Sequence, residues 1–130
     1  MTSSHFTARV YYEDTDFSGN VYHAAYLHFF ERARTEFLRE RGVHHSELVK
    51  DGIAFAVRTM TIDFKAAAHI DDLLEVTTEV ASLTAARLNL VQSISRDGAE
   101  ITRAAVQVVA IKTSGGAARM PRELLDLLKA

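Results

Sequence analysis

The sequence has 130 residues, 48% of them hydrophobic, which fits one domain over residues 1–130 with a core of ordinary size. Its 15 basic and 17 acidic residues give a formal net charge of −2, so composition offers no reason to expect nucleic acid or a membrane surface as partner. The absence of cysteine excludes disulfides and thiol chemistry.

The first part of the chain predicts a strand, a loop and one long helix. Residues 6–13 are rich in Val and Tyr, which favours a strand, and a Ser-Gly-Asn turn falls in a loop over residues 14–21. A helix is predicted over residues 24–41, because apolar side chains recur at helical spacing and Gly42 follows as a stop signal. The apolar stripe of this helix consists of Tyr26, Phe29, Phe30, Ala33 and Phe37.

The segment after the helix predicts a strand with an irregularity. Phe55 and Val57 alternate in one phase, and apolar residues from Met60 to Phe64 alternate in the opposite phase. A slip in a period-2 pattern predicts a β-bulge, here near Arg58. One further helical turn over residues 46–50 precedes this strand.

The remainder predicts three more strands and a short helix. Alternating patterns favour strands over residues 74–83, 87–95 and 100–112, and Asp97-Gly98 is a hairpin signal between the last two. Pro121 then opens a short C-terminal helix. The order of one strand, one long helix and four strands in a meander indicates an α+β fold with an antiparallel sheet covering the helix.

Three acids, Glu13, Asp14 and Asp16, stand just before the long helix. A carboxylate can attack an electrophile or activate water, and the free N–H groups at a helix start can hold an oxyanion. From the spacing alone, however, the simpler interpretation is that Asp16 caps a turn. Glu13 and Asp14 are expected to be structural.

The stretch YYEDTDFSGNVYHAAYLHFFERARTEFLRE resembles the signature of the hotdog-fold acyl-CoA thioesterases. It is most similar to the 4-hydroxybenzoyl-CoA thioesterase-like group, which includes the short-chain acyl-CoA thioesterase often encoded beside the Tol-Pal envelope system. The resemblance continues more weakly through AFAVRTMTIDFKAAAHIDDLLEVTTEV to the C-terminus.

This resemblance implies a five-stranded antiparallel sheet wrapped around the helix. It also implies that two subunits pair their sheets edge to edge, with the active sites at the interface, so we expect a homodimer or homotetramer. Strands such as residues 74–83 would otherwise leave an open edge.

The resemblance makes Asp16 the catalytic acid, acting as nucleophile or as general base. His23 matches a second family position: its backbone N–H is the expected oxyanion donor, and its side chain could orient water or substrate or assist the leaving thiolate. Tyr12 matches a third and could position Asp16 by a hydrogen bond. Without the resemblance, His23 would be a helix-terminus histidine and Tyr12 a half-buried strand aromatic.

Several residues are candidates for binding substrate. A related hotdog class uses a carboxylate on the helix, which brings in Glu31, although an exposed or ion-paired glutamate is the favoured interpretation. The pantetheine arm is expected near Thr59 and Met60, and Arg58 is the preferred partner of the CoA phosphates because it lies near the bulge. The basic residues available for that task are Arg58, Lys65, Arg87, Arg96, Arg103 and Arg119.

We therefore predict an enzyme that hydrolyses an acyl-CoA, with a short-chain or aromatic acyl group, and needs no metal or cofactor; acyl carrier protein is an alternative carrier. Other hotdog activities such as a dehydratase, and a non-catalytic acyl-thioester-binding or envelope-complex accessory protein, are the rival interpretations. The sequence departs from the family pattern at Asn20 and in the Ala66–His69 stretch. Neither departure falls on the Asp16 or His23 positions, and both could alter acyl preference or the hold on the nucleotide.

The expected location is the cytoplasm. The N-terminal residues lack the basic and then apolar pattern of a signal peptide. No apolar run in the sequence approaches the roughly 20 residues that a membrane span needs.

Overall fold

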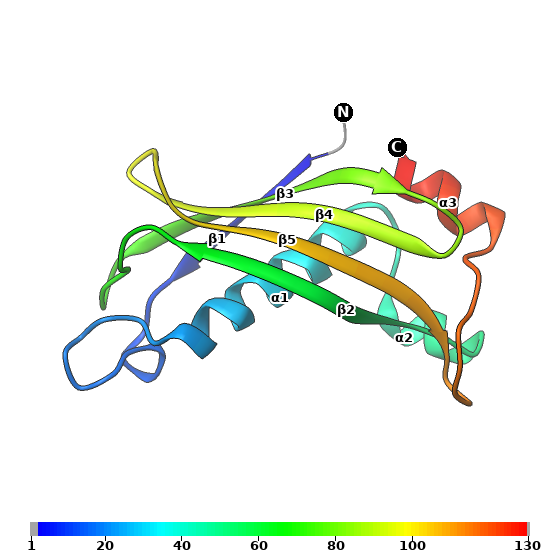
Figure 1. The fold of residues 1–130 in the computed structure, drawn as a ribbon, viewed down its shortest axis with the longest axis horizontal. Coiled ribbons are helices and arrows are strands. Elements are labelled where there is room, and N and C mark those ends of the chain that lie inside the picture. The colour runs from blue at the N-terminus through cyan, green and yellow to red at the C-terminus, as the bar shows by residue number, and fades with distance from the viewer. Residues whose placement is uncertain (1–2, 130) are drawn as a thin grey trace.

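The computed structural model describes residues 3–129, and its sheet wraps around one long helix (Figure 1). The five strands form one antiparallel sheet in the order β1-β3-β4-β5-β2. The predicted α+β architecture is confirmed. The elements are β1 (Ser3–Arg9), a 3₁₀ turn (Tyr12–Asp14), α1 (His23–Glu40), α2 (His45–Lys50), β2 (Ile53–Phe64), β3 (Leu73–Leu83), β4 (Arg87–Arg96), β5 (Ala99–Lys112) and α3 (Arg122–Lys129).

Helix α1 lies along the concave face of the sheet because its apolar stripe needs cover (Figure 1). Gly42 ends the helix in a left-handed conformation, with φ of +77°. Its N–H donates to the Arg39 carbonyl, and the N–H of Val43 donates to the Leu38 carbonyl, which is a Schellman motif. The predicted stripe is confirmed, since its five members are all buried, together with Ala25 and Leu38.

The first strand is shorter than predicted. It ends at Arg9, and residues Tyr12–Asp14 form a single 3₁₀ turn instead of continuing the strand. The cause is local: the carboxylate of Asp14 accepts a hydrogen bond from the N–H of Tyr11 at 2.9 Å, which closes the turn. Asp14 is thus structural, as expected.

The four later strands do not form a simple meander. Strands β3, β4 and β5 are joined in that way, but β2 pairs with β5, and β3 pairs with β1. Residues 65–72 therefore cross the end of the sheet; we name them the crossover segment. The crossing covers three strand spacings, about 15 Å, which eight residues span easily.

This topology moves the open edges. Strand β3, which was expected at an edge, lies inside the sheet, and the edges are β1 and β2. The edge at β1 is partly occupied by the end of α1, because the Ser4 hydroxyl donates to the Glu40 carboxylate and Arg41 donates to the Ser3 carbonyl. Strand β2 is therefore the more accessible edge.

The bulge predicted near Arg58 is confirmed. Val57 pairs with Val108 and Thr59 pairs with Gln107, so that Arg58 has no opposite residue. Within residues 3–129, no helix is long and apolar enough to cross a membrane.

Candidate active site

Asp16 begins a tight turn in the loop over residues 14–21, which we name the Asp16 loop. The Gly19 N–H donates to the Asp16 carbonyl at 3.1 Å, and the Asp16 N–H donates to the Asn20 carbonyl at 2.9 Å. Gly19 has φ of +84°, a conformation that costs glycine little and other residues more. The backbone of Asp16 is thus fixed by the loop's own hydrogen bonds.

The two carboxylate oxygens of Asp16 differ. Oδ1 accepts from the Ser18 hydroxyl at 2.5 Å and from the Ser18 N–H at 2.8 Å. Within residues 3–129, Oδ2 has no hydrogen-bond donor. The Ser18 hydroxyl, and then the Ser18 N–H, hold the pKa of Asp16 below its usual value. Asp16 therefore caps its turn with one oxygen and presents the other, ionised, to solvent.

The start of α1 supplies free backbone donors beside this carboxylate. Tyr22 is the N-cap residue, and the first intrahelical bond runs from the Ala25 N–H to the Tyr22 carbonyl. The N–H groups of His23 and Ala24 find no acceptor in the described part of the chain. Two such donors at the positive end of the helix dipole favour an anion or a developing oxyanion.

Aromatic side chains fix the position of the helix start against β2. The His23 ring packs on the Phe64 ring with centroids 4.6 Å apart, and the Tyr26 ring meets the same phenyl group edge-on at 5.2 Å. The contacts of Phe64 thus orient both His23 and Tyr26.

Asp16 and His23, two of the residues predicted to be catalytic, line one cavity of about 450 Å³. Helix α1, the Asp16 loop, the end of β2 and the crossover segment all contribute to it. The other lining residues are Asn20, Val21, Tyr22, Tyr26, Phe64, Lys65, Ala66 and Ala67.

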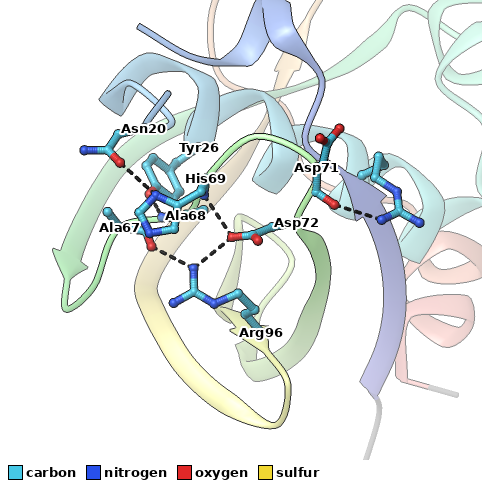
Figure 2. Close-up of polar contacts among 9 residues, drawn as sticks. Asn20, Tyr26, Ala67, Ala68, His69, Asp71, Asp72 and Arg96 are labelled. Carbon is cyan, nitrogen blue, oxygen red and sulfur yellow. Dashed lines mark hydrogen bonds and ion pairs between the residues drawn. The ribbon is translucent and has the colours of Figure 1, made fainter. Parts of the chain in front are cut away.

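The crossover segment is bound to the start of α1 and to the Asp16 loop (Figure 2). The Ala68 N–H donates to the buried Tyr26 hydroxyl at 2.9 Å. The Val21 N–H donates to the Ala68 carbonyl at 2.9 Å. His69 Nδ1 lies 2.7 Å from Asn20 Oδ1, which joins the crossover segment to the Asp16 loop through side chains as well.

Tyr12 is not part of this cavity. Tyr12 is 80% exposed, and in the described part of the chain no hydrogen bond joins its side chain to Asp16. Its contribution to the loop is its carbonyl, which accepts from the N–H and hydroxyl of Thr15. A catalytic role for Tyr12 stays a prediction that this geometry does not favour.

The residues predicted to bind substrate also lie away from this cavity. Arg58 is exposed and donates to Gln107 at 3.1 Å, and its neighbours Thr59 and Met60 lie on the same edge strand. Glu31 lines a second cavity of about 320 Å³, near the middle of α1. Apolar side chains of β2, β4 and β5 form much of that second cavity, including Phe55, Val57, Leu88, Leu90 and Val108.

The sequence pattern did not predict that the crossover segment lines the cavity. Lys65 was only one of six basic candidates, yet it lines the cavity, where it pairs with Glu100. The signal that could have found it is the order of strands, because β2 must leave the sheet edge next to the start of α1. No group of three potential metal-binding side chains occurs in residues 3–129.

Comparison with known proteins identifies the family. The model of the thioesterase-like superfamily matches residues 10–128. The chain belongs to this superfamily. It is 47% identical over 107 residues to the acyl-CoA thioesterase YbgC of Haemophilus influenzae, covering 82% of this chain and 79% of that protein.

Solved structures of this superfamily share the fold. A probable thioesterase from Bartonella henselae has 42% identity and a TM-score of 0.86, over 92% of this chain and 99% of that one. A 4-hydroxybenzoyl CoA thioesterase bound to 4-hydroxybenzoyl CoA has a TM-score of 0.91 over 98% of this chain and 99% of that one, at 19% identity, which bears on the fold alone. The five-stranded sheet around one helix is thus the hotdog fold of the thioesterase-like superfamily.

Proposed function

We propose that this thioesterase-like protein hydrolyses acyl-CoA thioesters to a free acid and CoA, with Asp16 as the reacting carboxylate. The observation that carries this proposal is that one cavity is lined both by Asp16, which has a carboxylate oxygen without a donor, and by His23, whose backbone N–H is free. The 47% identity to an acyl-CoA thioesterase over most of the chain supports the reaction and the substrate class.

The chemistry requires little else. The thioester carbonyl oxygen would accept hydrogen bonds from the N–H of His23 or Ala24, which stabilises negative charge as a tetrahedral centre forms. Asp16 Oδ2 would either attack the carbonyl carbon, giving an acyl-aspartyl anhydride, or take a proton from an attacking water. In both routes the C–S bond breaks and CoA leaves as a thiolate; in the first, water then cleaves the anhydride.

The mouth of the cavity supports CoA as the carrier. Lys65 lies on the cavity wall and could reach a phosphate by exchanging its bond with Glu100. An acyl carrier protein presents the same pantetheine arm and is the alternative carrier. We further propose that the enzyme acts in the cytoplasm, which suits a chain without cysteine.

We also propose that the chain forms a homodimer, or a tetramer of such dimers, by pairing β2 with the β2 of a second copy. A two-fold axis makes that pairing antiparallel, so the Phe64 end of one strand meets the Ile53 end of the other. The partner's Arg58, Thr59 and Met60 would then lie opposite the middle of β2, and residues near the partner's Ile53 would lie nearest the cavity of the first protomer. The predicted substrate-binding residues would thus line the interface between the two copies.

The test replaces Asp16 with Asn and measures thiol release from a panel of short-chain and aromatic acyl-CoAs. Asn keeps the shape but is a poor nucleophile and base, so kcat should fall by about 10²–10⁴-fold, as for loss of a general acid or base. Asp51→Asn, an exposed acid after α2, is the control and should leave kcat unchanged.

The rival function is a binding protein that holds acyl thioesters without cleaving them. That rival predicts wild-type protein that binds acyl-CoA in calorimetry and releases no thiol. Full activity in the Asp16→Asn variant would instead show that the protein is an enzyme in which Asp16 is not the reacting carboxylate.

A further inference from the structure

The Asp16 loop is held from one side by the crossover segment. The Ile70 N–H donates to the Gly19 carbonyl at 3.0 Å, and the Val21 N–H donates to the Ala68 carbonyl at 2.9 Å. The His69–Asn20 contact lies between these two bonds (Figure 2). The Asn20 carbonyl accepts the Asp16 N–H. A displacement of the crossover segment would therefore displace Asp16 through Asn20.

The crossover segment has no strand or helix of its own to hold it. Residues 65–72 are mostly exposed, with Ala68 fully buried among them. Such a segment needs an anchor on a rigid element if it is to position anything else.

Arg96, at the end of β4, is one such anchor (Figure 2). The Tyr26 hydroxyl also accepts from Ala68, and backbone hydrogen bonds join Asp71 and Asp72 to Val10. Arg96 Nη1 donates to the Ala67 carbonyl at 2.8 Å and to Asp72 Oδ2 at 2.8 Å. The same carboxylate oxygen accepts the His69 N–H at 2.9 Å, so one guanidinium nitrogen fixes both ends of residues 67–72.

The burial of this pair makes it stronger than a surface ion pair. The side chains of Arg96 and Asp72 are 26% and 22% exposed, so water screens their attraction less than that of fully exposed groups. Burial raises the pKa of the Asp72 carboxyl, but the hydrogen bonds from Arg96 and from the His69 N–H outweigh burial and leave the pKa below its usual value. Asp72 therefore remains a charged acceptor at neutral pH.

We propose that Arg96 is a positioning residue for thioester hydrolysis: it fixes the crossover segment and, through Ala68, His69 and Ile70, the Asp16 loop and the start of α1. This role rests on the proposed function of Asp16. In this proposal Arg96 positions the reacting groups. From the sequence alone, it is only one candidate partner of the CoA phosphates.

The experiment compares Arg96→Met, Arg96→Lys and the matched control Arg39→Met. Arg39 also pairs with a carboxylate, that of Glu36, but on the far part of α1. Arg96→Met should lower kcat about 10- to 100-fold, with KM changed by no more than about threefold, because small misplacements of reacting groups cost rate. Arg96→Lys should recover most of the loss, since one ammonium can donate to both acceptors.

Hydrogen exchange gives a measurement that does not depend on turnover. In Arg96→Met, amides of residues 14–23 should exchange faster, although they are distant in sequence, and in Arg39→Met they should not. Unchanged exchange there, or full kcat in Arg96→Met, overturns the proposal. The proposal is also overturned if the activity lost in Arg96→Met equals the fraction of unfolded protein, so that turnover per folded molecule is normal.

The Asp16→Asn background separates this inference from the proposed function. If Arg96 acts mainly through Asp16, then Arg96→Met should cost the residual rate of Asp16→Asn much less than the loss of about 10- to 100-fold expected in the wild-type background. A full additional loss overturns transmission through Asp16. Normal turnover of Asp16→Asn would contradict the proposed function, because Asp16 would then not be the reacting group. An inactive Asp16→Asn together with a fully active Arg96→Met would contradict only the role of Arg96.

Discussion

At the residue scale, the Asp16 carboxylate divides its two tasks between its oxygens. Oδ1 is engaged by Ser18, which orients the group, and Oδ2 has no donor in residues 3–129. The turn-capping and catalytic interpretations of Asp16 are therefore compatible. A carboxylate held by its own loop needs less reorganisation when the substrate arrives.

Replacing Ser18 with Ala should change the pH dependence of the enzyme. The Ser18 hydroxyl is the first cause of the lowered pKa of Asp16, and its removal leaves only the backbone donor on Oδ1. Because the charged form is the reactive one, activity falls as pH drops through this pKa. The acid limb of kcat/KM should therefore move to higher pH in Ser18→Ala, as measured by thiol release in buffers of constant ionic strength. An unmoved limb would mean that another group controls it.

Replacing His23 with Ala separates backbone from side chain. The N–H of residue 23 remains in the variant, while the ring contact with Phe64 is lost. We expect a loss in kcat of about 10- to 100-fold, below the range for loss of a general acid or base. A loss as large as that of Asp16→Asn would instead show that the imidazole itself takes part in proton transfer. Steady-state kinetics of the two variants side by side decide this.

At the element scale, α1 is tied to the sheet by a buried polar network as well as by its apolar stripe. Gln92 on β4 is fully buried; its amide donates to the Phe30 carbonyl at 3.1 Å and to the Thr78 hydroxyl at 2.9 Å. Arg34 donates to the Gln92 carbonyl oxygen at 3.0 Å. This network fixes the rotation of α1, because Gln92 binds both the Phe30 carbonyl and the Arg34 guanidinium of that helix.

Gln92→Ala should destabilise the protein strongly. It creates a cavity and leaves the partly buried Arg34 without its acceptor, so we expect a loss of about 2–4 kcal/mol in the free energy of unfolding. Gln107→Ala on β5, which removes a half-buried glutamine of the same size, is the control and should cost about 1 kcal/mol or less. Urea denaturation of both variants measures the difference. Equal losses of stability in the two variants would show that the Gln92 hydrogen bonds contribute nothing beyond the volume of the side chain.

The same elements show which parts of the fold can be predicted from the sequence. Helix α1, its stop at Gly42 and the bulge at Arg58 depend on neighbours within a few residues, so local pattern predicts them. The pairing of β2 with β5 depends on residues about 50 positions apart, and no local pattern encodes it. The predicted meander failed for that reason, and the crossover segment was missed with it. Asp16 and His23 lie close in sequence, so local pattern could place both beside the helix start, whereas the contact between Asn20 and His69 could not be predicted.

At the scale of the whole molecule, the accessible edge of β2 predicts the assembly. Val57 on β2 is 43% exposed and Val49 on α2 is 53% exposed, so they form a matched pair of exposed apolar residues. Sedimentation velocity at micromolar concentration should give a species of at least twice 14.4 kDa. Val57→Glu should shift it toward the monomer because like charges then meet across the two-fold axis, while Val49→Glu should not. A fully active wild-type monomer would contradict the dimer.

The strand order described above also sets a sequence of events in folding. Ser3 pairs with Glu79, and Ile53 pairs with Lys112, so β1, α1 and β2 leave the ribosome before their partners exist. Only β3, β4 and β5 can form from neighbouring hairpins, and the earlier elements must then add to that nucleus. Strand β2 is completed only once β5 has arrived, and it is the same strand that we propose meets a second copy. Assembly should therefore follow folding, because its surface does not exist until the last strand of the sheet is in place.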